Sequence, residues 1–282
     1  MPPDPFAAGM ISSGARTSGG CTDTCGANLD SMDWSDLTDE LDVWRDEGRT
    51  ASLWWRDDDA VAPAPALDRL AALAHGHEVT VGLAVIPALA EPALAPWLGS
   101  VRAEVLQHGW AHRSHAAPGE KKTELGGRRA PDEVTAELTR GLRRLGEIAG
   151  DRLRAVLVPP WNRIDPALIQ ALPCAGFRGF SAYGPRSGVE PAPGLRQANC
   201  HVDVVDWRGG RGFVGCGRAL ASVVAHLAAR RARSVDPAEP TGLLTHHAVH
   251  EESTWTFVAR FIECTRRHPA ARWLAPGEAI LG

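Results

Sequence analysis

The sequence predicts an α/β protein in which one parallel sheet curls into a closed or nearly closed β/α barrel. Short apolar runs alternate with helical segments from residue 51 onward, which is the order of a parallel sheet with crossover helices. Four of these runs end in polar clusters, and the carboxyl ends of barrel strands form the active-site face. With 282 residues, 44% of them hydrophobic, one barrel is the simplest arrangement at this length.

The first 31 residues are rich in Pro, Gly, Ser and Thr and show no apolar periodicity. We therefore expect a disordered tail over 1–31 and a single barrel domain over 32–282. Met32 opens the first segment with helical patterning, which favours a working protein that starts near this residue.

The elements after the tail follow one another in a β-then-α order. Helical patterning covers residues 32–48, 64–76, 130–150, 165–176, 218–233 and 253–268. Strand patterning covers residues 51–55, 79–85, 103–107, 154–159, 200–207 and 242–247. The longest helix has Pro131 in its first turn and Gly150 at its end, where these residue types are favourable. We find no internal repeat.

The composition excludes several classes of protein. The formal charge of −4 lacks the basic excess that binding to a nucleic-acid backbone requires. No run of eighteen apolar residues occurs, and no charged start precedes an apolar run, so we expect a cytoplasmic protein without a membrane partner. The six cysteines lack the paired spacing of a zinc knuckle and are expected to be free thiols.

Three adjacent carboxylates, Asp57, Asp58 and Asp59, follow the first apolar strand. Because they repel one another, they are either solvated or compensated by a cation, a raised pKa or an arginine such as Arg56. A solvated acidic loop is therefore the alternative to a functional site here.

Two histidines four residues apart, His108 and His112, form the second cluster. On a helical turn this spacing places both imidazoles on one face, where they can share a metal with a carboxylate from elsewhere. Gly109 stands where a thermolysin-like protease has glutamate, which excludes that class. The alternative is a pair of structural histidines.

Three further clusters follow, two of them at the end of an apolar run. Pro159 and Pro160 fix the backbone before Trp161 and Asn162, and a rigid turn there can offer a backbone N–H to an oxyanion. The segment DVVDW, 203–207, alternates in the manner of a strand. In the last cluster two adjacent histidines end a strand and point in opposite directions, so at most one faces a shared site.

In this order the five clusters resemble the motifs of the polysaccharide deacetylase family, also called the NodB-homology domain or carbohydrate esterase family four. The family pattern runs T-F-D-D-G, H-T-x-x-H, R-P-P-Y, D-x-x-D-W and L-x-H. This sequence has RDDDA, HGWAH, VPPW, DVVDW and LTH between Arg56 and His246. The resemblance implies a single-domain, distorted (β/α)7-type barrel of the glycoside hydrolase/deacetylase kind.

The resemblance also implies one divalent metal ion, for which zinc is our first expectation. Its ligands would be Asp59, His108 and His112, and Asp58 would be the catalytic base. A competing register, one residue earlier, would make Asp58 the ligand and Asp57 the base.

Other roles follow from the same comparison of motifs. Trp161 takes the position whose backbone N–H assists the oxyanion, and His246 takes that of the general acid. We assign substrate contacts to four residues: Arg56, Asn162, Asp206 and Trp207.

The sequence departs from the family pattern at two positions. Val158 replaces the arginine that begins the third motif and orients the catalytic aspartate, so Arg56 or Arg163 would have to supply that charge. His247 stands where many members have aspartate, which makes it an alternative proton donor.

These residues predict a metal-dependent hydrolase that removes an acyl group, expected to be N-acetyl, from a small soluble glycan or related amide. The bond cleaved would be a C–N bond other than a peptide bond. Two alternatives stay open: a non-catalytic glycan- or metal-binding relative, which Val158 favours, and a metal amidohydrolase for a non-carbohydrate amide.

Overall fold

A computed structural model of the protein describes residues 33–282. The expected tail over 1–31 lies outside the described residues, and the boundary proposed at residue 32 stays a prediction. Helix α1 begins directly after Asp33, whose side chain accepts a hydrogen bond from the Ser35 N–H, while Asp36 accepts one from the Asp33 N–H. This capping box fixes the start of the first described element.

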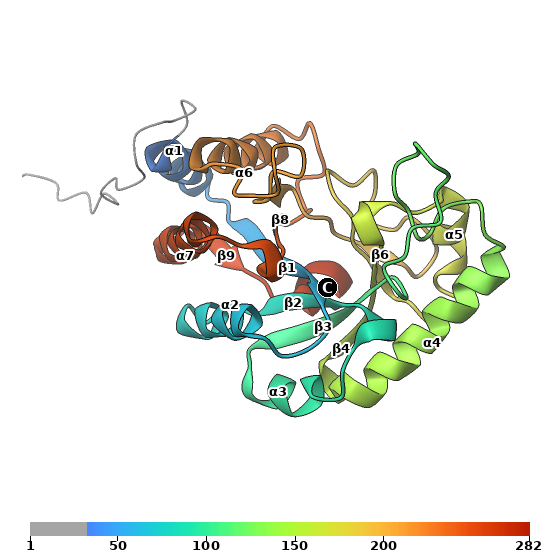
Figure 1. Ribbon diagram of the computed structural model, residues 1–282. Helices are drawn as coiled ribbons and strands as arrows, with labels where there is room; N and C mark the ends of the chain where they lie inside the picture. Colours follow the sequence, from blue (N-terminus) through green and yellow to red (C-terminus); the bar gives the residue numbers. More distant parts are fainter. Residues whose placement is uncertain (1–32) are drawn as a thin grey trace, which may run out of the picture.

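The strands form one curled, parallel sheet (Figure 1). The strands of residues 33–282 are β1 (Ala51–Ala60), β2 (Val81–Val85), β3 (Ala103–His108), β4 (Leu153–Val158), β5 (Gly179–Phe180), β6 (Arg196–Gln197), β7 (Val202–Asp203), β8 (Thr241–Thr245) and β9 (Ala271–Trp273). Their order is β6-β5-β4-β3-β2-β1-β8-β7, with β9 added to β1. Strands β6 and β7 are consecutive parts of one extended segment, 196–203, which pairs with β5 on one side and with β8 on the other.

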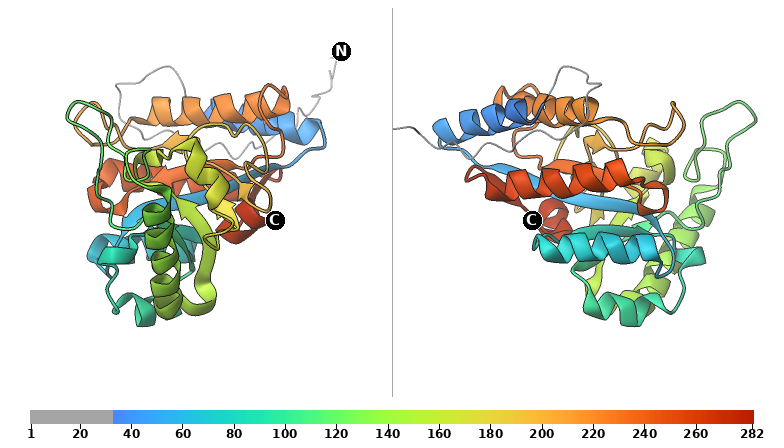
Figure 2. Two further views of the ribbon diagram at one scale, coloured as in Figure 1. Left: turned by 90° about the vertical axis from the view of Figure 1, so that its right-hand side faces the viewer. Right: turned by 60° about the vertical axis from the view of Figure 1, so that its left-hand side comes forward.

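Helices surround the sheet, as the views in Figure 2 show. They are α1 (Trp34–Asp46), α2 (Pro65–Gly76), α3 (Leu94–Ser100), α4 (Pro131–Ala149), α5 (Pro166–Ala171), α6 (Cys216–Arg231), α7 (Glu252–Arg267) and α8 (Pro276–Leu281). Single 3₁₀ turns are η1 (Pro87–Leu89), η2 (Gly150–Arg152), η3 (Pro160–Asn162) and η4 (His247–Val249). Proline is the first residue of α2, α4, α5 and α8. At this position the backbone N–H has no partner within the helix, so the absence of an N–H in proline costs no hydrogen bond.

The barrel interior is apolar at the end opposite the polar clusters. Helix α8 covers this end. Its Pro276 lies so close to Gly82, near the start of β2, that a Cβ on Gly82 would be 3.0 Å from the proline ring. Inward-facing side chains above it include Trp54, Leu106 and Val158, all fully buried. The carboxyl ends of the strands are thus the end that can carry a polar site.

The fold class is confirmed: the protein is a single-domain α/β barrel built on a parallel sheet. The strand expected over 200–207 shortens to β7, because the Asp203 side chain accepts the Val205 N–H and the chain turns. Helix α3, helix α8 and strand β9 were not expected. None of the helices in residues 33–282 is long and apolar enough to span a membrane.

Candidate active site

The three consecutive aspartates at the end of β1 face three different environments. A register irregularity between Asp57 and Ala60 interrupts the pairing of β1 with β2, and Asp59 has a left-handed backbone with φ of 74°. A left-handed aspartate breaks the alternation of a strand, so neighbouring carboxylates need not point to strictly opposite sides. Each carboxylate consequently has its own partner, which removes the expected mutual repulsion. A solvated acidic loop is excluded, since Asp57 and Asp58 are buried.

Asp59 lies against the two histidines of the second cluster. Its Oδ1 is 3.2 Å from Nε2 of His108 and 3.3 Å from Nε2 of His112. His108 Nδ1 lies 3.0 Å from the carbonyl oxygen of Val158, so Nδ1 donates to that carbonyl and Nε2 is the nitrogen that faces Asp59. One carboxylate and two imidazoles converge here, with ligand atoms within 4.8 Å of one another.

The donor set fits a divalent metal ion. Carboxylate oxygen and imidazole nitrogen are the ligands of catalytic zinc sites, which leave further coordination positions open. Burial favours the neutral form of Asp59, but the hydrogen bond and charge of His108 together with the charge of His112 lower its pKa. Burial and the charge of His108 lower the pKa of His112, which favours the neutral imidazole that a metal ligand requires.

The second cluster is a bend and not the helical turn expected from its spacing. Strand β3 ends at His108, and both Gly109 and His112 have positive φ, 55° and 53°. The buried carboxylate of Glu124 holds this bend by accepting hydrogen bonds from the N–H groups of Trp110 at 3.0 Å and Ala111 at 2.8 Å. A Cβ at position 109 would lie 2.0 Å from the Glu124 carboxylate, which explains the glycine.

Glu124 was not singled out in the sequence, since it lies in a long loop without periodic pattern. We expect Glu124→Ala to lower the free energy of unfolding by about 1–3 kcal/mol, because the part-buried N–H groups of Trp110 and Ala111 lose their acceptor. We also expect metal affinity to fall by about 10- to 100-fold, the usual effect of losing a group that orients a ligand. Urea unfolding and a zinc titration measure the two effects. Glu120→Ala, which removes an exposed side chain of the same loop, is the control, and unchanged zinc affinity in Glu124→Ala would contradict this role.

Arg56 forms a bidentate ion pair with Asp58. Its Nε and Nη2 donate to Oδ1 and Oδ2 of Asp58 at 2.8 and 3.0 Å, and both side chains are buried. The other arginine considered, Arg163, donates through Nη1 to the carbonyl oxygen of Lys122 and is exposed. Val158, at the family's arginine position, lies in the apolar barrel interior. Arg56 is therefore the residue that supplies a positive charge to Asp58.

This arrangement corrects the expectation that Arg56 contacts substrate. The remaining N–H groups of the guanidinium donate to Ser181, Ala182 and Asn162, the last at 2.7 Å to Oδ1. Because every donor is used and the side chain is fully buried, no group is left for a ligand.

The two adjacent histidines after β8 have different partners. His246 Nε2 lies 3.9 Å from Asp58 Oδ2, and its ring meets the edge of Trp207 at a centroid distance of 4.7 Å. His247 instead pairs through Nδ1 with Asp57 Oδ1 at 2.5 Å, while Asp57 Oδ2 accepts the Thr245 hydroxyl at 2.7 Å. Burial opposes charge on both groups, but their mutual attraction lowers the pKa of Asp57 and raises that of His247.

In the fourth motif, Asp203 and Trp207 contact each other beside His246, whereas Asp206 contacts the turn that follows. The indole N–H of Trp207 donates to Asp203 Oδ2 at 2.8 Å, and burial raises the pKa of Asp203. Asp206 stabilises the next turn by accepting the N–H groups of Arg208 and Gly209, and it pairs with Arg218. The assignment of Asp206 to substrate stays a prediction. The alternation of the motif could have pointed to Asp203, which lies on the other face of the strand.

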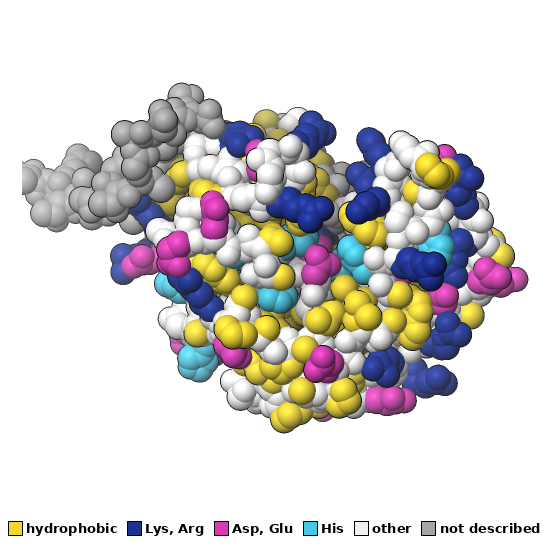
Figure 3. Space-filling view, viewed as in Figure 1, with side chains coloured by type: hydrophobic (Ala, Val, Ile, Leu, Met, Phe, Trp, Pro, Cys, Tyr) yellow, Lys and Arg dark blue, Asp and Glu magenta, His cyan; other side chains and the backbone are white. Residues whose placement is uncertain are grey.

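The third motif forms the turn η3. Trp161 and Asn162 both have left-handed backbones, with φ of 56° and 55°, a conformation that costs energy for residues other than glycine. The Trp161 ring packs against His112 with centroids 4.3 Å apart. In this way the turn joins the His112 bend to the Arg56–Asp58 pair through Asn162. In Figure 3, which has the same view as Figure 1, histidine side chains gather near the centre of the molecule, with an acidic side chain among them.

No family model matches the sequence, and no curated protein matches it either. Solved structures do match the fold. A candidate polysaccharide deacetylase from Mycobacterium smegmatis matches with a TM-score of 0.58 and 19% identity over 81% of this chain and 87% of that chain. A family 4 carbohydrate esterase from Streptomyces lividans, solved with acetate, matches with a TM-score of 0.53 and 12% identity, covering 82% and 96%.

A third structure is a family 4 acetyl xylan esterase from Clostridium thermocellum, solved with a cobalt ion. Its TM-score is 0.50 at 14% identity, and the match covers 81% of this chain and 89% of that chain. Because all three identities are low, these matches establish the fold alone. The chain has the fold of the polysaccharide deacetylases of carbohydrate esterase family four, and the resemblance indicated by its five motifs is confirmed at that level.

Proposed function

We propose that the protein is a metal-dependent hydrolase that removes an N-acetyl group from a carbohydrate or a related small amide. The observation that carries the proposal is the convergence of Asp59, His108 and His112 beside an Asp58 whose carboxylate lies 3.9 Å from His246. Solved structures with this fold include deacetylases and esterases of family 4, which supports hydrolysis of an acyl group.

Asp59 Oδ1 and the Nε2 atoms of His108 and His112 would hold the metal, with zinc as the first expectation. A bound divalent cation supplies Lewis acidity and lowers the pKa of a coordinated water. The Val158 carbonyl, bonded to Nδ1, keeps Nε2 of His108 directed to this position. Glu124 keeps the bend that carries His112 in place.

Asp58 is the proposed general base, which accepts the proton of the attacking water. Arg56 fixes the orientation of its carboxylate through two hydrogen bonds, and the oxygen that faces His246 is Oδ2. The Trp161 N–H is the proposed donor to the oxyanion that forms on the amide carbonyl. His246 is the proposed acid, because an amine must be protonated to leave.

Acetate release from a panel of N-acetylated sugars and small amides, with and without added zinc, tests the proposal. We expect release that depends on metal and is lost in Asp58→Asn. Release from small amides only would favour the amidohydrolase alternative. Sugar binding without release from any substrate, in metal-loaded protein, would contradict an enzymatic function and favour the binding protein. The binding-protein alternative rests on Val158, which replaces the family's arginine. Arg56 counts against this alternative, because it supplies the positive charge beside Asp58.

A further inference from the structure

A pocket of about 450 Å³ adjoins the candidate active site. Its wall includes Asn162, the residue whose Oδ1 accepts a hydrogen bond from Arg56, and the neighbouring turn carries Trp161. The guanidinium of Arg56 therefore lies between Asn162, on the pocket wall, and Asp58. A substrate whose acetamide reached the proposed catalytic groups could place a neighbouring substituent in this pocket.

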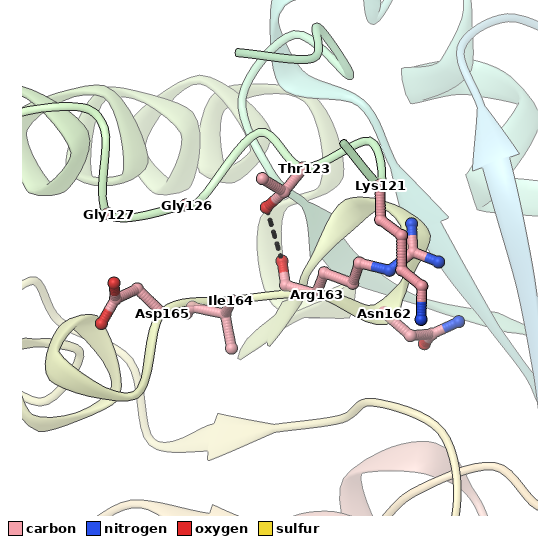
Figure 4. A pocket seen from close by; sticks show the side chains of 8 residues that line it. All are labelled: Lys121, Thr123, Gly126, Gly127, Asn162, Arg163, Ile164 and Asp165. Carbon is pink, nitrogen blue, oxygen red and sulfur yellow. Dashed lines mark hydrogen bonds between the residues drawn. The ribbon is translucent and has the colours of Figure 1, made fainter. Parts of the chain in front are cut away.

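The end of the pocket next to the active site is positively charged. Lys121, Arg163 and Asn162 all line the pocket, and in Figure 4 the side chains of Lys121 and Arg163 are drawn at the same end of it as Asn162. Arg163 uses Nη1 for the Lys122 carbonyl, and neither Lys121 nor Arg163 forms a salt bridge within residues 33–282. Because Oδ1 of Asn162 accepts from Arg56, the NH₂ group is the part of this lining side chain that is left for a ligand. Two cations and an amide donor therefore meet at one end.

The opposite end of the pocket carries the one acidic group of its wall. Asp165 lies away from the two cations in Figure 4, and its Oδ1 accepts the Ala167 N–H at the start of α5. This carboxylate therefore neutralises neither Lys121 nor Arg163. The local excess of positive charge contrasts with the formal charge of −4 of the whole chain.

We propose that this pocket binds an anionic group of the substrate, a carboxylate or a phosphate, on the same molecule as the acetamide. Guanidinium and ammonium groups hold such anions through charge-assisted hydrogen bonds. The inference rests on the proposed function, since it assigns the substrate class of the same site: acidic rather than neutral N-acetyl compounds. It predicts that binding of the anionic substrate weakens as salt concentration rises.

Three matched sugars test the proposal: N-acetylglucosamine, its 6-phosphate, and the corresponding 6-carboxylate. We expect kcat/KM for at least one anionic sugar to exceed that for the neutral sugar by tenfold or more. Whichever anion is preferred identifies its source as carboxylate or phosphate. In the double variant Lys121→Ala/Arg163→Ala, KM for that sugar should rise at least tenfold with kcat nearly unchanged, while the neutral sugar is unaffected. Lys122→Ala is the matched control, because its side chain does not line the pocket.

A second measurement separates this inference from the proposed function. Calorimetric binding of the same sugars to zinc-loaded Asp58→Asn does not require turnover. Tighter binding of an anionic sugar, lost in the triple variant that adds Lys121→Ala and Arg163→Ala, supports the pocket even if no acetate is released. Equal binding of the neutral and both anionic sugars overturns the pocket proposal, whether or not hydrolysis is observed.

Discussion

Asp58→Asn is expected to keep its metal and to lose hydrolysis, whereas Asp59→Asn is expected to lose the metal. Asp59 Oδ1 is the oxygen that lies within 3.3 Å of both imidazole nitrogens, while both Asp58 oxygens face Arg56 and one faces His246. Losing a general base typically slows a reaction by about 10²- to 10⁴-fold. Metal content by elemental analysis and acetate release by the same preparations measure the two effects.

Asp57→Asn is the control for the register of the three aspartates. This change leaves His247 buried beside a neutral amide, and breaking a buried ion pair costs about 3–5 kcal/mol. We therefore expect reduced stability with metal still bound and substantial activity at low temperature. If Asp57→Asn were instead stable, metal-loaded and inactive, the base and ligand roles would belong to Asp57 and Asp58.

Strand ends are the part of this site that sequence could predict. The alternation of strands and helices fixed the parallel order, and parallel strands place their carboxyl ends at one edge. The end of β1, His108 at the end of β3 and the residues after β8 therefore meet, as the motif order implied. The resemblance supplied roles for these residues but could not decide which pair of aspartates was meant.

That choice depends on backbone geometry. The irregularity after Asp57 and the left-handed Asp59 set the direction of each carboxylate, and no residue type in RDDDA requires either feature. Arg56 had a usable signal, because residues two apart on a strand share a face and Arg56 precedes Asp58 by two. Val158 replaces the arginine of the family motif, and Arg56 on β1 provides the positive charge beside Asp58 instead.

Contacts made by long loops could not be predicted. Glu124 reaches the His112 bend from a loop that carries no hydrophobic period, and such contacts depend on how the loop folds over the surface. The fourth motif shows a related limit. The strand stops at Asp203, so alternation places Asp203 but no longer places Asp206.

His246→Ala is expected to reduce kcat/KM for an N-acetyl amide by about 10²- to 10⁴-fold, the usual scale for loss of a general acid. The same variant should lose much less on an activated aryl acetate, because a phenolate leaves without a proton. The geometry behind this expectation is the placement of His246 beside Asp58 and Trp207, whereas His247 is bound to Asp57. Parallel kinetics on the two substrates measure the difference.

His247→Ala supplies the matched control for this selective defect. Because it leaves the buried Asp57 carboxylate without its partner, we expect a loss of stability of about 3–5 kcal/mol and a similar reduction on both substrates. A stability deficit lowers the amount of folded enzyme, and it therefore cannot discriminate between leaving groups. A defect confined to the amide in His247→Ala, with His246→Ala near wild type, would move the proton donor to His247. In that case Nε2 of His247 would be the donating nitrogen, because Nδ1 is bound to Asp57.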